Sequence, residues 1–213
     1  MSGEYIFNGV IILKTLIFDM YGVILKESKG NFIPYTFKHF PSEEHDRLKK
    51  LFFVDKLLTK AGNGEITSRE FLTALGYKNY DFHMRDYIEN YLTMDKEFYL
   101  FADSIKNKYK FVLLSNDVSD WSKYITEYYD LNKYFPVKII SAEVHCRKPE
   151  ARIYEIALER LGVPGNECIF IDNSVENLVT AKKFGIDVIL FNRDNVIYDG
   201  KIVYSFNDLL HMI

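Results

Sequence analysis

The segment Ile11–Val23 reads IILKTLIFDMYGV and places branched and aromatic apolar residues directly before Asp19. A short, nearly continuous apolar run is typical of a strand buried on both faces of a parallel sheet. Ligands of open α/β sheets bind outside the carboxyl ends of the strands, so residues that follow such strands are candidate functional residues. We therefore predict a first core strand over Ile11–Phe18, which places Asp19 at a ligand-binding edge.

Four further apolar runs indicate more strands of the same sheet: Phe111–Leu114, Lys138–Ile140, Cys168–Ile171 and Val188–Phe191. Helical periodicity between the later runs predicts helices over Pro149–Leu161 and Ser174–Phe184, each followed by a glycine. A third helix is expected after Asp120. This alternation predicts an α/β fold with a doubly wound parallel sheet and right-handed connections.

The stretch from residue 30 to residue 94 departs from this alternation, because it has helical periodicity and no convincing strand. Thr67 and Glu70 form a capping-box pattern ahead of apolar residues, and Ser42 begins an earlier helix. A connection this long between two strands is far outside the usual range. We predict an α/β core of residues 10–29 and 95–213 with an inserted α-helical cap of residues 30–94.

The overall composition excludes several classes of protein. The 213 residues are 48% hydrophobic and 27% charged, with a net charge of -3 and no segregated basic stretch, so no nucleic-acid partner is expected. The apolar run from Val10 is far shorter than the ~20 residues that span a bilayer, and no signal-peptide pattern precedes it. Cys146 and Cys168 are too few for a disulfide framework. We expect a cytoplasmic protein without a membrane segment, and the sequence leaves its oligomeric state open.

The residues that follow the predicted strands form a coherent chemical set. Asp19 follows the first strand, Ser115 and Asn116 the second, Lys148 the third at a short distance, and Asp172 the fourth. A carboxylate is ionised at neutral pH and can attack phosphorus without activation, while a lysine and a hydroxyl can stabilise the transferring group. Magnesium prefers oxygen ligands and commonly takes one or two carboxylates with phosphate and water. The set predicts phosphoryl transfer through Asp19, with Mg²⁺ bound by Asp19 and Asp172.

In this order, the motifs resemble those of the haloacid dehalogenase (HAD) superfamily: Asp-x-x-Gly after the first strand, Ser after the second, Lys-Pro, and an acidic cluster after the fourth. The resemblance covers nearly the whole chain. It implies a HAD Rossmann-like core in which the helical insertion is the C1 cap. It also implies that the metal is held by the nucleophile Asp19, the backbone carbonyl of Tyr21, and Asp172.

The run Arg147–Tyr154, RKPEARIY, most resembles the branch that includes the α-glucose-1-phosphate phosphatases. This resemblance implies a small phosphorylated metabolite, such as a sugar phosphate, as the substrate. Ser115 and Lys148 would contact its phosphate, and Asn116 and Asn177 are expected near the site.

Tyr21 departs from the family pattern, because most family phosphatases carry there an aspartate that protonates the leaving group. A phenol with a pKa near ~10 can donate a proton in principle, but at neutral pH it cannot act as the base. Losing a general acid–base typically costs ~10²–10⁴-fold in rate. Asn173 is also neutral where a second carboxylate is usual, and Glu176 is the nearest acid. Tyr21 is therefore a candidate catalytic residue that favours substrates with good leaving groups.

Two other functions stay open from the sequence. Asp-x-Tyr-Gly also resembles 2-haloacid dehalogenases, whose halide leaves without a proton; Arg47 is a loose candidate to hold the substrate carboxylate. Those enzymes work without metal, whereas this chain keeps Asp172, whose charge opposite Asp19 would be costly without a cation. The other alternative is a HAD-fold binding or regulatory protein with little turnover. The five histidines share no spacing and are assigned no catalytic role.

Overall fold

The computed structural model describes residues 4–7 and 10–213 of the chain. Six parallel strands form its central sheet: β3 (Thr15–Phe18), β4 (Lys110–Ser115), β5 (Val137–Ile140), β6 (Cys168–Asp172), β7 (Asp187–Phe191) and β8 (Ile202–Val203). Their order across the sheet is β5-β4-β3-β6-β7-β8. The predicted parallel α/β sheet is confirmed, and β8 is a short edge strand that the apolar pattern did not indicate.

The run Ile11–Phe18, predicted as one strand, is divided between two strands. Its first part belongs to β2 (Val10–Leu13), which pairs antiparallel with β1 (Glu4–Phe7). Thr15 is level with the first residues of both neighbouring strands, β4 and β6, so the residues before it extend beyond the central sheet. Residues 1–9 received no functional interpretation from the sequence, and residues 1–3 and 8–9 lie outside the described part.

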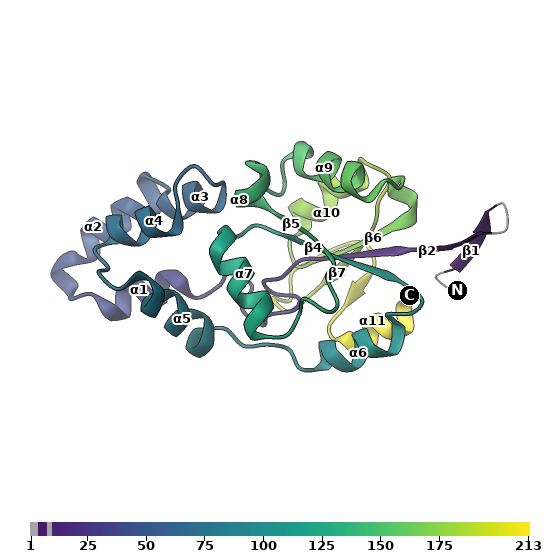
Figure 1. Cartoon of the computed structure of the whole chain (residues 1–213), viewed down its shortest axis with the longest axis horizontal. Coiled ribbons are helices and arrows are strands. Elements are labelled where there is room, and N and C mark those ends of the chain that lie inside the picture. The colour runs from purple at the N-terminus through teal and green to yellow at the C-terminus, as the bar shows by residue number, and fades with distance from the viewer. Residues whose placement is uncertain (1–3, 8–9) are drawn as a thin grey trace.

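Helices cover both faces of the sheet (Figure 1). Leu16 and Phe18 share one apolar cluster with α6 (Glu97–Ile105), α7 (Ser119–Tyr128) and α11 (Phe206–Met212). Ile17 shares the other with α9 (Ala151–Leu161) and α10 (Val175–Lys182). Two short elements, α8 (Ser141–Val144) and the 3-10 turn Gly165–Glu167, complete the core. Because successive side chains of β3 enter opposite clusters, the strand is buried on both faces, as its sequence predicts.

Two predicted helices begin slightly later than their sequence pattern indicates. The helix expected from Pro149 begins at Ala151, with Glu150 at its N-cap position, and the helix expected from Ser174 begins at Val175. Pro149 therefore precedes the helix and does not open it.

Residues 30–94, between β3 and β4, fold into helices, as their periodicity predicts, and these helices lie at one end of the molecule (Figure 1). Thr67 and Glu70 form the predicted capping box at the start of α4. Phe32 packs on Trp121 of α7 with ring centroids 4.7 Å apart, so this insertion shares an apolar core with the sheet domain. Its elements are α1 (Phe32–His39), the 3-10 turn Ser42–Glu44, α2 (His45–Lys49), the π-helical turn Lys50–Val54, α3 (Leu57–Gly62), α4 (Ser68–Leu75) and α5 (Tyr80–Tyr91).

The two chain segments that join the insertion to the sheet run beside one another. Leu25 and Met94 form an antiparallel bridge between them. Arg193, two residues after the end of β7, donates to the carbonyl of Val23 at 2.9 Å and pairs with Asp95. The domain boundaries expected at residues 29/30 and 94/95 stay a prediction. Within the described ranges, no helix has both the length and the apolar content needed to cross a membrane.

Candidate active site

The strand order brings the predicted site residues to one edge, because β4, β3 and β6 are parallel neighbours. Asp19 follows β3, whereas Ser115 and Asp172 are the last residues of β4 and β6. The backbone N–H of Asp19 donates to the carbonyl of Ile171 at 2.9 Å, which fixes Asp19 beside the end of β6.

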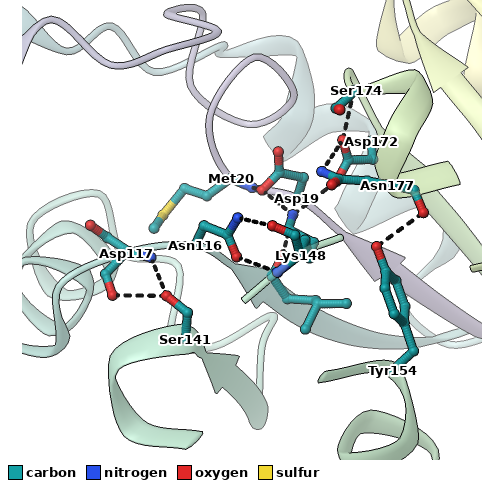
Figure 2. Close-up of polar contacts among 11 residues, drawn as sticks. Asp19, Met20, Asn116, Asp117, Ser141, Lys148, Tyr154, Asp172, Ser174 and Asn177 are labelled. Atoms are coloured by element: carbon teal, nitrogen blue, oxygen red, sulfur yellow. Dashed lines mark hydrogen bonds and ion pairs between the residues drawn. The ribbon is translucent and has the colours of Figure 1, made fainter. Parts of the chain in front are cut away.

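Lys148 lies between the two aspartates and contacts both (Figure 2). Its Nζ is 2.7 Å from Asp19 Oδ1, 2.8 Å from Asp172 Oδ2, and 2.8 Å from the carbonyl oxygen of Leu114. The lysine is only 3% exposed. Burial works to lower the pKa of Lys148, but Asp172 and Asp19 together raise it, so the side chain stays a cation. Burial also raises the pKa of Asp19, and Lys148 opposes that rise.

Asp172 uses both carboxylate oxygens inside the protein. Oδ1 accepts from the Ser174 backbone N–H at 2.7 Å and from Asn177 Nδ2 at 3.0 Å. Oδ2 accepts from Lys148 Nζ at 2.8 Å and from Asn177 Nδ2 at 3.0 Å. The side chain is fully buried. Asp172 thus accepts from three donor groups, Lys148 Nζ, Asn177 Nδ2 and the Ser174 N–H, and both of its oxygens are engaged by the protein.

Asn116 and Ser115 differ in what their side chains contact. The Asn116 amide donates to the Lys148 carbonyl and accepts from the Lys148 N–H, both at 2.8 Å, so it fixes the backbone of the lysine. Ser115 is fully buried, and its hydroxyl has no hydrogen-bond partner within the described ranges. Asn116 lines the cavity beside Asp19 and Lys148, whereas Ser115 is not among the residues of its wall.

A buried carboxyl that the sequence analysis did not assign lies beside Tyr21. The Tyr21 hydroxyl donates to Asp117 Oδ1 at 3.3 Å, and the Val118 backbone N–H donates to the same oxygen at 2.8 Å. Burial raises the pKa of Asp117 to about 8, and nearby Asp19 adds to the rise. Burial, followed by Asp117, raises the pKa of Tyr21 well above its usual range. The only sequence signal was an acidic residue two positions after Ser115, and that signal does not show its contact with Tyr21.

A cavity of about 590 Å³ connects these groups to the helical insertion. The sheet edge contributes Asp19, Lys148 and Asp117 to its wall, and the insertion contributes Phe32 and Tyr87. The size is typical of small-molecule sites, which range from about 300 to 1,000 Å³.

Polar contacts hold the insertion against the core around this cavity. Ser141 Oγ donates to the Gly62 carbonyl, and His145 Nδ1 lies 3.2 Å from the carbonyl oxygen of Asn63. The cavity is therefore bounded by both the insertion and the α/β core, and its shape depends on both.

Some of the oxygen atoms near Asp19 are suitable ligands for magnesium, and others are already engaged by the protein. Asp19 lines the cavity, and its Oδ2 makes no hydrogen bond within the described part of the chain. A Cβ on Gly22 would lie 2.3 Å from the Asn173 amide nitrogen, so Asn173 packs directly beside the residue that follows Tyr21. Carboxylate and carbonyl oxygens are suitable ligands. Direct ligation by Asp172, in contrast, conflicts with its four internal hydrogen bonds.

Several other candidates lie away from the cavity. Arg47 donates to the carbonyl of Leu75 at 2.8 Å and pairs with Glu44, which leaves it outside the cavity wall. The cavity wall contains none of the five histidines, and among the described residues no three His, Cys, Asp or Glu side chains gather as a metal site. Arg147 does line the cavity, and it forms no ion pair within the described ranges.

A family model described as haloacid dehalogenase-like hydrolase matches residues 13–185. The chain therefore belongs to this family of hydrolases, as its motifs indicated.

Individual relatives match shorter stretches. The chain is 36% identical over 66 residues to (S)-2-haloacid dehalogenase 4A of Burkholderia cepacia, a match that covers 31% of this chain and 27% of that protein. It is 33% identical over 79 residues to the phosphorylated carbohydrates phosphatase of Thermotoga maritima, covering 37% of this chain and 32% of that protein. The chain thus spans less than a third of the length of these curated relatives.

Solved structures share the fold at low identity. A HAD phosphatase from Thermococcus onnurineus gives a TM-score of 0.74 at 19% identity and covers 94% of this chain and 97% of that chain. The HAD family enzyme bt-2542 from Bacteroides thetaiotaomicron, in complex with magnesium and inorganic phosphate, gives 0.70 at 23% identity and covers 83% of this chain and 93% of that chain. These similarities confirm the HAD fold.

Proposed function

We propose that the chain is a magnesium-dependent phosphatase or phosphotransferase that acts on a small phosphorylated metabolite through an aspartyl-phosphate at Asp19. The observation that carries the proposal is the arrangement of the Asp19 carboxylate. Lys148 Nζ and the Met20 backbone N–H each hold Oδ1 at 2.7 Å, Oδ2 has no hydrogen-bond partner among the described residues, and Asp19 lines the cavity. A carboxylate fixed on one oxygen and free on the other is a pre-organised nucleophile.

In the proposed reaction, the free Asp19 oxygen forms a bond to phosphorus while the bond from phosphorus to the ester oxygen breaks. The leaving alkoxide takes up a proton and departs as an alcohol. Water then attacks the phosphorus of the acyl phosphate, which releases Asp19 and inorganic phosphate. Lys148 stabilises the charge of both steps, the Ser115 hydroxyl bonds a phosphate oxygen, and Asn116 holds Lys148 in place.

Asp19, the Tyr21 carbonyl and Asn173 would hold the metal ion, and Asp172 would act by holding Lys148. Bound magnesium neutralises phosphate charge that would otherwise repel an anionic nucleophile. Support comes from the oxygen donors beside the cavity and from the magnesium and inorganic phosphate in the similar Bacteroides thetaiotaomicron enzyme. Under the same proposal, residues 30–94 form the cap over the active site, and the protein is located in the cytoplasm.

Tyr21 limits which leaving groups the site can handle. Its phenol stays neutral because burial raises its pKa, and its hydroxyl donates to Asp117. We expect acyl phosphates to react fastest, sugar 1-phosphates at intermediate rates and simple alkyl phosphates slowest, because good leaving groups need least protonation.

The main experiment compares phosphate release from a panel of phosphorylated metabolites, with and without magnesium, with halide release from 2-chloropropionate. Metal-dependent phosphate release supports the proposal. Halide release without metal would favour the dehalogenase alternative, which draws on Tyr21 and on the match to (S)-2-haloacid dehalogenase 4A. Trapping of Asp19 by beryllofluoride without turnover of any substrate would favour the binding or regulatory alternative.

A further inference from the structure

Arg147 is a cation of the cavity wall that no step of the proposed reaction uses. It is partly buried, and its side chain forms no hydrogen bond and no ion pair within the described ranges. A guanidinium group has five N–H donors, so all of them are available. None of its nitrogens is among the fully buried, unpaired atoms of that part of the chain, so a ligand in the cavity can reach the group.

The partial burial of Arg147 is not compensated by a nearby acid. Burial lowers the pKa of Arg147 and Glu150 opposes this fall, but Glu150 is exposed and forms no ion pair in the described part of the chain. Moving a charge out of water without a partner costs free energy. A ligand anion at the guanidinium group supplies the missing partner.

The acids of the cavity wall do not fill this role. The wall contains four of them, and none pairs with Arg147 within the described ranges: Asp19, Asp117, Glu176 and Asp194. Asp19 already pairs with Lys148 at 2.7 Å. Burial raises the pKa of Asp117 to about 8, so this acid is mostly neutral at pH 7. Glu176 is exposed to solvent. The cation at Arg147 is therefore left for a group of the substrate.

Neighbouring contacts place Arg147 between the reacting groups and the helical insertion. Lys148, the next residue, contacts the nucleophile Asp19. The segment before Arg147 contacts the insertion, because Ser141 Oγ donates to the carbonyl of Gly62 at the end of α3. The insertion bounds the part of the cavity that lies beyond the reacting phosphate. Arg147 accordingly faces the leaving-group portion of a substrate rather than the phosphorus alone.

The geometry of the guanidinium group identifies the kind of anion. Its planar fork donates two parallel N–H bonds to the two oxygens of a carboxylate or a phosphate, which a lysine cannot do. The reacting phosphate already meets the charge of Lys148. A second oxyanion on the same substrate is the group that Arg147 is suited to bind.

We propose that Arg147 is a specificity-determining residue that binds a second oxyanion, either a carboxylate or a second phosphate, on the leaving-group portion of the substrate. The cavity then selects phosphorylated metabolites with two anionic groups over phosphate esters of neutral alcohols. This inference rests on the proposed function, because it names the substrate class of the same cavity.

The test uses two matched pairs of esters. 3-Phosphoglycerate and glycerol 1-phosphate share a three-carbon chain and differ in a carboxylate; fructose 1,6-bisphosphate and fructose 6-phosphate differ in a second phosphate. The measured quantity is the ratio of kcat/KM within each pair. Wild-type protein should prefer the doubly anionic member of at least one pair by about tenfold or more, because charge-assisted hydrogen bonds are strong. The pair that shows the preference identifies the oxyanion.

Arg147→Met keeps the length of the side chain without its charge and should reduce that preference by about tenfold or more. Arg160→Met, at an exposed arginine of α9 without an ion pair in the described ranges, is the matched control and should leave it unchanged. Circular dichroism checks folding, and Arg147→Gln replaces Arg147→Met if the latter is unfolded. Equal losses on both members of a pair would show that Arg147 acts on the reacting phosphate, and would overturn the proposal.

A binding experiment separates this inference from the proposed function. Calorimetry on Asp19→Asn protein with magnesium measures Kd for the four esters without turnover, and Asp19→Asn/Arg147→Met shows whether any preference depends on Arg147. A preference for a doubly anionic ester that Arg147→Met removes supports the inference even where wild-type protein hydrolyses none of the esters, a result that would refute the phosphatase. Equal affinities within both pairs, or no binding of any ester, overturns the inference whatever the activity.

Discussion

Asp172 and Asp117 are both buried carboxyl groups at the carboxyl ends of strands, on opposite sides of Asp19 in the sheet, yet their surroundings differ. Asp172 accepts four hydrogen bonds, one of them from the Lys148 ammonium group. Asp117 accepts hydrogen bonds from two neutral donors and forms no ion pair in the described part of the chain. Burial accordingly raises the pKa of Asp117 to about 8.

The difference separates an ion-paired scaffold from a buried acid without a compensating charge. On the Asp172 side, a lysine shared between two carboxylates fixes the nucleophile, and both oxygens of Asp172 bond to groups of the protein. On the Asp117 side, one oxygen is buried and has no hydrogen-bond partner among the described residues. Each prediction below tests one side of this comparison.

The largest effect is expected for Asp19→Asn, which should reduce turnover to the detection limit on every substrate, because an amide is a very poor nucleophile. The assay is phosphate release at saturating magnesium, with circular dichroism as a check that the variant is folded. Wild-type activity in this variant would rule out covalent catalysis at Asp19.

Lys148→Ala should lower kcat by about 10²-fold or more, because the charge beside the transferring group is lost. It should also destabilise the fold by about 3–5 kcal/mol, since two buried carboxylates then face one another without a cation. Urea denaturation measures the second effect, and Lys123→Ala, at an exposed lysine, is the control. A fully stable Lys148→Ala protein would contradict the scaffold interpretation.

Tyr21→Asp should raise alkyl phosphate turnover by up to ~10²-fold relative to acyl phosphate turnover, because it introduces a general acid–base. The new carboxylate would lie in a space shaped for a phenol, and packing losses of about 1–3 kcal/mol would offset part of the gain. The informative quantity is the ratio of rates on the two substrate types. If that ratio matches in wild-type and variant proteins, another residue protonates the leaving group.

Asn173→Asp should tighten magnesium binding by about tenfold, or ~1.4 kcal/mol, because a carboxylate replaces an amide that packs beside Gly22, the residue after Tyr21. Calorimetry would measure this, with Glu176→Gln, at an exposed acid on the cavity wall, as the control. Equal affinity in Asn173→Asp and wild type, together with a large loss in Asp172→Asn, would restore Asp172 as the direct ligand.

The smallest effect concerns pH and Asp117. Burial raises the pKa of Asp117 to about 8 in the folded protein, whereas the usual pKa of an aspartate, expected in the unfolded chain, is 3.8. The folded chain therefore binds this proton more tightly than the unfolded chain. Stability from this group is fully present below pH ~4 and is lost as the pH rises toward ~8. Asp117→Asn should therefore raise Tm by about 3 °C or more at pH 8.5 and by less at pH 5. A Tm difference that is the same at both pH values would show that Asp117 is not a buried, uncompensated acid.

Most of the fold could be predicted from the sequence because its signals are local. Continuous apolar runs marked β4, β5, β6 and β7, and the Thr67–Glu70 pattern marked the start of α4. Where the sequence-based strand boundary was wrong, pairing with the neighbouring strands set the boundary. The run Ile11–Phe18 divides because β4 and β6 begin level with Thr15, and nothing in the run itself encodes that register.

The sequence alone determined which chemical groups stand at the sheet edge: a nucleophilic carboxylate, a hydroxyl, a lysine and a second carboxylate, each directly or shortly after a strand. Tertiary structure decided what each group is free to do. Lys148 forms an ion pair with Asp172, and the Asn116 side chain bonds to the Lys148 backbone. Asp117 accepts from Tyr21 through Oδ1, and its Oδ2 has no partner among the described residues. The physical reason is that hydrogen bonds and desolvation depend on which segments meet in space, and residues 21, 117, 148 and 172 meet only once the sheet and the insertion have formed.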